Sequence, residues 1–125
     1  MVLLDTHTLI WFMFDDSKLS DKALGIIKSE DKVFVSIASL WEIAIKQSLG
    51  KLDLDCSVQD VADNLRDANI SVLPVEPKHL DCLKTLPFIH RDPFDRLIVA
   101  QTYSEGMALI TKDTIIPQYD ISTVW

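Results

Sequence analysis

The 125-residue sequence predicts an α/β protein in which helices cover both faces of a parallel sheet. The first observation is that short apolar segments alternate with longer segments whose apolar residues recur at helical spacing. The second is the length, which suits one domain with its own core, so we expect residues 1–125 to form a single domain. The third is the composition, since 48% hydrophobic and 25% charged residues are typical of a globular protein.

Five segments of the sequence have the character of strands. Residues 2–5 ("VLLD") form an apolar run that ends on an acid, and residues 32–36 ("KVFVS") combine β-branched and aromatic side chains. Residues 70–75 and 107–111 are similar runs, and the closing "VW" (124–125) fits a short edge strand. In a parallel sheet the ligand crevice lies beyond the carboxyl ends of the strands, so acids that directly follow a strand are candidates for a functional site.

Six segments have apolar residues at helical spacing, and several carry signals for their ends. Thr6 or Thr8 is available to cap the first helix, and Ser39 with Glu42 has the spacing of a capping box. Gly106 suits the end of the last helix. The predicted helices span residues 6–14, 19–30, 39–51, 57–69, 77–86 and 92–106.

The charge balance and the cysteines restrict the class of protein. A formal net charge of −7 argues against a general basic surface for nucleic acid, although acids gathered around bound cations would be partly neutralised. The N-terminal segment lacks the pattern of a signal peptide, and the apolar run at 9–14 is too short to cross a membrane. Cys56 and Cys82 fit no disulfide framework, so we expect a cytoplasmic protein with reduced thiols and no membrane partner.

Four acids are candidates for a functional site, and each also has a local explanation. Asp5 and Asp113 follow predicted strands, but either can cap the helix or turn after it. Glu42 can complete a capping box or pair with Lys46, four residues later. Asp95 lies where the dipole of the last helix favours an acid.

The stretch "HRDPFDR" (90–96) places two aspartates three residues apart. We expect Asp92 to be the N-cap, because Pro93 suits the first helical position. Asp95 then lies in the first turn, from which its carboxylate can reach the strand ends that carry Asp5 and Asp113. The alternative is that Asp92 is itself a ligand or supports one.

Taken together, the four acids indicate a site for a divalent cation. Carboxylates that lie close together repel one another unless a cation lies among them, and hard oxygen ligands suit Mg²⁺ or Mn²⁺. Such an ion can activate a water for attack on a phosphodiester. The histidines lack the spacing of a zinc site; they are His7, His79 and His90.

Four motifs, in this order, resemble the PIN-domain family and, within it, the VapC-type toxins of prokaryotic toxin–antitoxin pairs. They are "LLDTHTLIW" (3–11), "SLWEIAIKQSLGKL" (39–52), "HRDPFDRLIVAQ" (90–101) and "LITKD" (109–113). The resemblance covers the chain from Val2 to Trp125. It implies a three-layer α/β/α sandwich with a central, mostly parallel sheet, and a metal-dependent endoribonuclease that hydrolyses RNA with a metal-activated water.

The resemblance also implies roles for particular residues. The acids that hold Mg²⁺ or Mn²⁺ and act in catalysis would be Asp5, Glu42, Asp95 and Asp113. Hydroxyl and carboxylate groups that support them would come from Thr6, Thr111 and Asp92. Apart from the resemblance, four cations near the proposed site can position the RNA backbone, and an ordinary solvated charge is the other explanation for each; they are Lys46, Arg91, Arg96 and Lys112. Toxins of this type usually bind a small antitoxin that covers the site, and they usually form homodimers.

Two other functions compete with the nuclease. An aspartyl-nucleophile phosphatase usually has a D-x-D sequence after the first strand, whereas this chain has "DTH" at 5–7. A non-catalytic interaction module would use aromatic side chains on a partner or dimer surface, and core packing is their other explanation. The aromatic residues concerned are Trp11, Phe12, Phe14 and Trp41.

Overall fold

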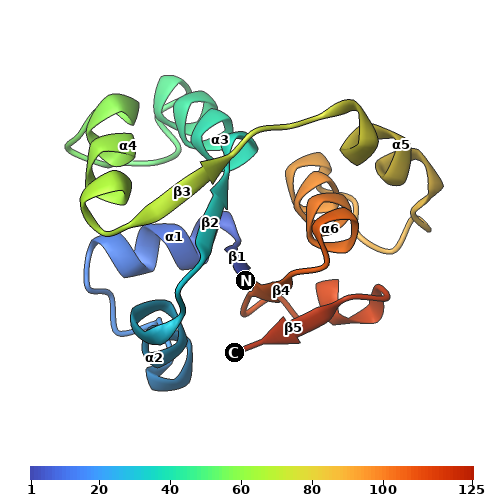
Figure 1. The fold of residues 1–125 in the computed structure, drawn as a ribbon. Coiled ribbons are helices and arrows are strands. Elements are labelled where there is room, and N and C mark those ends of the chain that lie inside the picture. Colours follow the sequence, from blue (N-terminus) through green and yellow to red (C-terminus); the bar gives the residue numbers. More distant parts are fainter.

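The computed structural model describes all of residues 1–125, and its strands form one sheet in the order β3-β2-β1-β4-β5 (Figure 1). Every neighbouring pair is parallel, and Leu4 lies opposite Val35 on one side and Ile110 on the other. The strands are β1 (Val2–Leu4), β2 (Val33–Ser36), β3 (Ile70–Leu73), β4 (Ala108–Ile110) and β5 (Ser122–Val124). The carboxyl ends of all five strands therefore meet at one edge, and the strand order reverses beside β1.

Two layers of helices cover the sheet, as predicted. Helices α1 (Thr6–Met13), α2 (Asp21–Ser29), α3 (Ile37–Ser48) and α4 (Val58–Asp67) lie on one face, and α5 (Pro77–Thr85) and α6 (Pro93–Glu105) on the other (Figure 1). Side chains alternate across β1, so Val2 and Leu4 join the core under the first four helices. Leu3 joins the second core, under α6. The three-layer α/β/α sandwich is confirmed.

Helix α1 begins at Thr6 as predicted, and of the candidate caps it is Asp5, and neither Thr6 nor Thr8, that is the N-cap. Helix α3 begins earlier than predicted. The N-cap of α3 is Ser36, whose hydroxyl accepts the backbone N–H of Ala38 at 3.0 Å. The predicted capping box of Ser39 with Glu42 is therefore wrong, because Ser36 ends β2 in an extended conformation and the helix starts at once. This earlier start places Glu42 in the second turn of α3, where its side chain is free to take part in a site.

The other boundaries lie close to the predicted ones. Strand β3 ends at Leu73 because Pro74 has no N–H to continue the ladder. Gly106 takes a left-handed conformation with φ 64° and ends α6, as predicted. A short 3-10 helix, η1 (Ile116–Gln118), precedes β5, which starts two residues earlier than predicted. No helix is both long enough and apolar enough to span a membrane.

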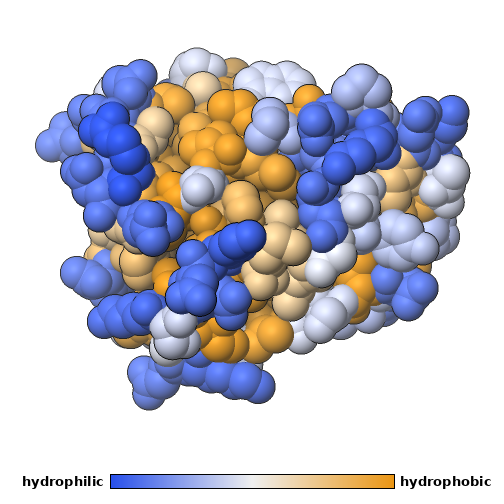
Figure 2. Space-filling model, in the orientation of Figure 1, coloured by the Kyte–Doolittle hydropathy of each residue, from blue (hydrophilic) through white to orange (hydrophobic).

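An apolar area lies on the face of the molecule seen in Figure 1. Figure 2 shows it near β3 and α3, flanked by hydrophilic residues. An entirely apolar groove is formed by Ile37, Ala38, Trp41, Val75, Leu80 and Leu97. Trp41 is 60% exposed and its ring meets the edge of Phe94, with centroids 5.1 Å apart.

Candidate active site

Asp5 lies at the carboxyl end of β1 and has two roles at once. One carboxylate oxygen, Oδ1, accepts the backbone N–H of Thr8 at 2.8 Å and caps α1. The other, Oδ2, accepts a hydrogen bond from the hydroxyl of Thr111, which follows β4. The hydroxyl of Thr8 donates to the carbonyl of Ile110 at 3.0 Å. The two explanations for Asp5 are thus compatible, and the ends of β1 and β4 are tied together beneath the site.

Glu42 is buried, and both of its carboxylate oxygens have partners. Oε1 accepts the hydroxyl of Thr6 at 2.8 Å, and Oε2 lies 2.6 Å from Nζ of Lys46. The hydrogen bond to Glu42 raises the pKa of Lys46; burial opposes the rise, and the charges of Asp92 and Asp95 add to it. Lys46 is therefore a cation already held among the acids rather than a free surface charge.

The two aspartates of "HRDPFDR" divide their contacts as predicted. Asp92 is the N-cap of α6, and its Oδ1 accepts the backbone N–H groups of Phe94 at 2.8 Å and Asp95 at 3.2 Å. Asp95 lies in the first turn of the helix with no such bond. The pKa of Asp95 is raised to about 7, chiefly by burial and then by the charge of Asp92, with smaller contributions from Asp5 and Glu42 and an opposing one from His90. Asp95 is therefore the acid of the site whose ionised form is least stabilised by its surroundings.

His90 lies beside the acids, although its spacing from the other histidines fits no metal site. Its Nε2 lies 3.1 Å from Oδ2 of Asp113 and 3.3 Å from Oδ2 of Asp95. Its Nδ1 accepts the backbone N–H of Asp92 at 3.1 Å, so the proton of the neutral ring is on Nε2. His90 therefore donates to Asp113 and lies within ion-pair distance of Asp95. The available signal was its position directly before the two aspartates.

Asp113 follows β4 and is held by the turn after it. Its Oδ1 accepts the backbone N–H groups of Ile115 at 2.7 Å and Ile116 at 3.0 Å. Burial alone would raise the pKa of Asp113, but the hydrogen bonds from Ile116, His90 and Ile115 outweigh it and lower the pKa. Asp113 is thus fixed as an ionised carboxylate.

Three of the four predicted acids line one open cleft at the carboxyl edge of the sheet. The cleft has a volume of about 400 Å³ and is lined by Asp5, His7, Trp11, Asp95, Lys112, Asp113 and Thr114. Nζ of Lys112 lies 5.8 Å from the centroid of the Trp11 ring, so this cation faces the cleft as predicted. Glu42 is not in the lining. It lies beside the cleft, near enough for its charge to raise the pKa of Asp95.

Arg96 does not lie where an RNA contact would need it. Its side chain is buried, at 8% exposure, and Nη1 donates to the carbonyl of Pro87 at 2.9 Å and to the hydroxyl of Tyr119 at 3.2 Å. The guanidinium lies 4.3 Å from the centroid of the Phe88 ring. Arg96 therefore anchors the loop between α5 and α6, whereas Arg91 in that loop is exposed.

The donor groups of the cleft fit a hard divalent cation. His90, Asp95 and Asp113 offer ligand atoms that all lie within 4.8 Å of one another. The two carboxylates suit Mg²⁺ or Mn²⁺, and the open cleft leaves room for the waters and phosphate oxygens that such ions keep. As placed, His90 presents a proton rather than a lone pair, so it orients the acids instead of adding a nitrogen ligand.

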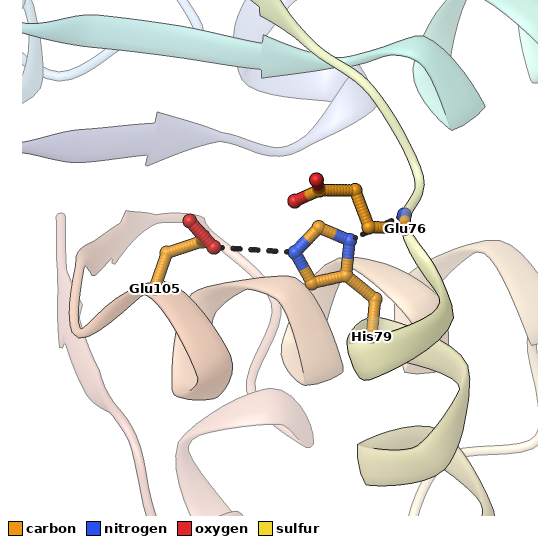
Figure 3. A group of neighbouring side chains, drawn as sticks. All are labelled: Glu76, His79 and Glu105. Atoms are coloured by element: carbon orange, nitrogen blue, oxygen red, sulfur yellow. Dashed lines mark hydrogen bonds and ion pairs between the residues drawn. The ribbon is translucent and has the colours of Figure 1, made fainter.

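A second group of acids and histidine lies elsewhere and has a structural role. His79 of α5 is fully buried; its Nδ1 accepts the backbone N–H of Glu76 at 2.9 Å, and its Nε2 faces Oε2 of Glu105 at 3.3 Å (Figure 3). Lys78 holds the same Oε2 at 2.8 Å. Both ring nitrogens and the carboxylate thus have partners, and the group fastens α5 to the end of α6.

The fold and the cleft define a class of protein. Its members have a parallel sheet whose strand order reverses at one point, and carboxylates that suit a divalent cation gather there. The sequence model of the PIN domain matches residues 2–122, and the chain belongs to the PIN domain family. Ribonuclease VapC22 of Mycobacterium tuberculosis (strain ATCC 25618 / H37Rv) is 31% identical over 117 residues, which cover 90% of this chain and 86% of that protein.

Solved structures share the fold. The chain is similar to one in the crystal structure of VapBC2 from Rickettsia felis bound to a promoter DNA fragment, with a TM-score of 0.75, 14% identity, and 99% of this chain and 98% of that chain covered. A toxin–antitoxin complex from Klebsiella pneumoniae gives a TM-score of 0.71 at 16% identity, covering 100% of this chain and 97% of that chain. The predicted PIN-domain family and VapC-type resemblance are confirmed.

Proposed function

We propose that this chain is a Mg²⁺- or Mn²⁺-dependent endoribonuclease and the toxin of a type II toxin–antitoxin pair. The observation that carries the proposal is the convergence of Asp5, Asp95 and Asp113 in one cleft, in a PIN-domain chain. The 31% identity to a protein named Ribonuclease VapC22 supports RNA as the substrate. Residues 1–125 act in this proposal as one domain, and the two free cysteines agree with a cytoplasmic location.

Each residue of the site has a role in the proposed hydrolysis. Asp5, Asp95 and Asp113 hold the ion, and Glu42 joins them directly or through water. When bound, Mg²⁺ or Mn²⁺ lowers the pKa of a water and offsets the charge that develops on the scissile phosphate. Thr6 and Thr111 fix Glu42 and Asp5 through the hydrogen bonds described above. Asp92 supports Asp95 by capping its helix.

The cations near the cleft contact the RNA backbone in this proposal. Lys112 lines the cleft, and the exposed Arg91 lies next to His90 in the sequence. The ion pair with Glu42 holds Lys46 beside the acids. In this position its positive charge attracts the phosphate of the RNA. Arg96 is left out of this set because its guanidinium is engaged with Pro87 and Tyr119.

Two protein partners belong to the proposal. A cognate antitoxin is supported by the structural neighbours, which include a toxin–antitoxin complex from Klebsiella pneumoniae. A homodimer is supported by the apolar groove that includes Ile37, Trp41 and Leu80, because exposed apolar surfaces of this kind mark sites of protein association.

The test is cleavage of RNA by the purified protein. We expect cleavage with Mg²⁺ or Mn²⁺, none with EDTA, and none from a folded Asp5→Asn protein. A wild-type protein that is folded and binds RNA but does not cut it under any of these conditions would support the non-catalytic interaction module instead. Cleavage that is unaffected by EDTA would contradict the metal dependence.

A further inference from the structure

Phe88, in the loop between α5 and α6, is unusually exposed for an aromatic residue. It is 91% exposed, whereas the other exposed large hydrophobic side chains range from 37% to 61%. One face of its ring is covered by the guanidinium of Arg96 at 4.3 Å. The rest of the ring is open to solvent, so its other face is available to a flat partner.

The surroundings of Phe88 are cationic in an otherwise acidic chain. It lies in a shallow groove lined by Leu83, Lys84, Phe88, Arg91, Pro93 and Arg96. Three of these residues are cations and none is an acid, although the whole chain has 19 acids against 12 cations. Lys84 pairs with Asp81 at 3.1 Å, but Arg91 makes no salt bridge. The groove therefore offers an uncompensated positive charge to an anion.

The loop that carries Phe88 is held in place and is linked to the acids. The hydroxyl of Tyr119 accepts the backbone N–H groups of Ile89 at 3.2 Å and His90 at 2.8 Å, and it accepts from Arg96 at 3.2 Å. The ring of His90 in turn contacts Asp95 and Asp113. Phe88 is thus carried by a fixed loop, two residues before a histidine that contacts two acids of the cleft.

We infer that Phe88 and Arg91 form a binding site for one unpaired nucleotide of single-stranded RNA. An aromatic ring with a guanidinium on one face and solvent on the other is suited to base stacking, and Arg91 is suited to the adjacent phosphate. This inference rests on the proposed ribonuclease function. It assigns the contact with an unpaired base to Phe88, because only an unpaired base can leave its stack to meet the ring.

The first experiment measures binding of an eight-nucleotide single-stranded RNA that carries 2-aminopurine, with Asp5→Asn protein and Mg²⁺ so that the strand stays intact. Adding Phe88→Ala should weaken binding about tenfold, the typical effect of one stacked base, and remove the change in 2-aminopurine emission. Phe88→Trp should preserve both. Phe88→Leu keeps an apolar side chain over Arg96 but lacks a flat ring, so it should bind like Phe88→Ala.

Matched controls come from residues of the same type elsewhere on the surface. Tyr103 is 58% exposed and lies outside the groove, so Tyr103→Ala should leave binding unchanged. Arg91→Ala should reduce the dependence of log affinity on log salt by about 0.7, the value for one phosphate contact on a single strand. Arg66→Ala, on α4, should not change it.

The outcomes separate this inference from the proposed function. If the wild-type protein cuts RNA while the Phe88→Ala and Phe88→Leu proteins, shown by circular dichroism to be folded, bind the strand as tightly as the parent, the nucleotide site is overturned and the ribonuclease stands. Unchanged RNA binding by both variants is also the result expected if Phe88 contacts a protein partner instead of RNA. If the wild-type protein neither binds nor cuts RNA, the nucleotide site and the proposed ribonuclease function are both contradicted.

Discussion

His90 and Asp113 are joined by a hydrogen bond of 3.1 Å between Nε2 and Oδ2, which links the loop before α6 to the loop after β4. Asp95 lies 3.3 Å from the same nitrogen. The His90 ring therefore lies between two carboxylates from separate parts of the chain, bonded to Asp113 and close to Asp95. Their mutual repulsion would otherwise drive them apart, so the acids are oriented before any cation arrives.

We predict that His90→Ala weakens Mn²⁺ binding by about 10- to 100-fold, the usual effect of removing a group that orients metal ligands. His90→Gln should restore part of the affinity, because its amide can donate to one of the carboxylates. The measurement is calorimetric titration with Mn²⁺. His7 is the control: it lines the cleft but stacks on Trp11, with ring centroids 5.6 Å apart, so His7→Gln should bind Mn²⁺ like the wild type. Equal affinity for His90→Ala and His7→Gln would rule out the orienting role.

Asp5→Asn should abolish RNA cleavage while leaving the fold intact. An asparagine at this position can still accept the N–H of Thr8, so the cap of α1 is kept while the negative charge is lost. Asp5→Ala should be equally inactive but less stable by about 1 kcal/mol, because it also loses the cap. Cleavage assays and urea unfolding of the pair check this, and a folded Asp5→Asn protein with wild-type activity would remove Asp5 from the site.

Asp92 and Asp95 should differ in kind when they are replaced. Asp92→Ala should lower the free energy of unfolding by about 1 kcal/mol, the cost of a lost cap, and leave substantial activity. Asp95→Asn should abolish activity. Without metal it should leave stability unchanged or slightly higher, since a repelling charge has gone. If the Asp92→Ala protein were as inactive as the Asp95→Asn protein and equally stable, Asp92 would have to be a ligand.

The pH dependence of stability should report Asp95. Its pKa of about 7 in the folded protein is above the ordinary value of about 4, so the folded state binds this proton more tightly than the unfolded state. In EDTA, the wild type should therefore lose stability relative to Asp95→Asn as the pH rises from about 4 to about 7, and no further above that. Urea midpoints across this range measure the difference.

Mn²⁺ should reverse that loss at high pH, because the ion binds the ionised carboxylates of the folded state alone. Millimolar Mn²⁺ should raise the midpoint of the wild type at pH 8 and change that of Asp95→Asn much less. If the difference in urea midpoint between the wild type and Asp95→Asn stayed constant with pH, Asp95 would not have the raised pKa. If Mn²⁺ and EDTA gave the wild type the same midpoint, Asp95 would not belong to a metal site.

A homodimer should depend on the apolar groove. We expect the wild type to sediment at about twice its 14.2 kDa chain mass at micromolar concentration, and Leu80→Glu to sediment as a monomer, since a buried unpaired carboxylate is costly. Phe14→Glu is the control, because Phe14 and Leu80 are both 49% exposed but Phe14 lies outside the groove. A monomeric wild type, or equal dimers from both variants, would contradict this surface.

Local sequence signals were sufficient for the fold and for the cap of α6. Alternating strands and helices predict a parallel sheet, and proline after Asp92 predicts its cap, because both depend on residues close together in the sequence. The predicted N-cap of α3 is three residues late, since Ser36 and Ser39 are equally good caps and only the end of β2 selects the first. That choice depends on pairing with strands far along the chain.

The sequence indicates which acids belong to the site, but it does not show which side chains contact one another there. The burial of Arg96 follows from its bonds to Pro87 and Tyr119, and Tyr119 is 23 residues away in the sequence. Likewise, the part played by His90 depends on Asp113, 23 residues later. No helical or strand periodicity connects such residues, so sequence spacing ranks Arg96 with Arg91 although one is buried and the other exposed.

The tie between β1 and β4 has a consequence for the order in which the site can form. Asp5 is bound to Thr111, and Asp113 follows two residues later, so the cleft combines residues that lie more than one hundred positions apart in the sequence. A fragment that stops before β4 would keep Asp5 but lack both Thr111 and Asp113. The cleft therefore exists only once β4 has paired with β1, and no part of the chain without β4 contains it.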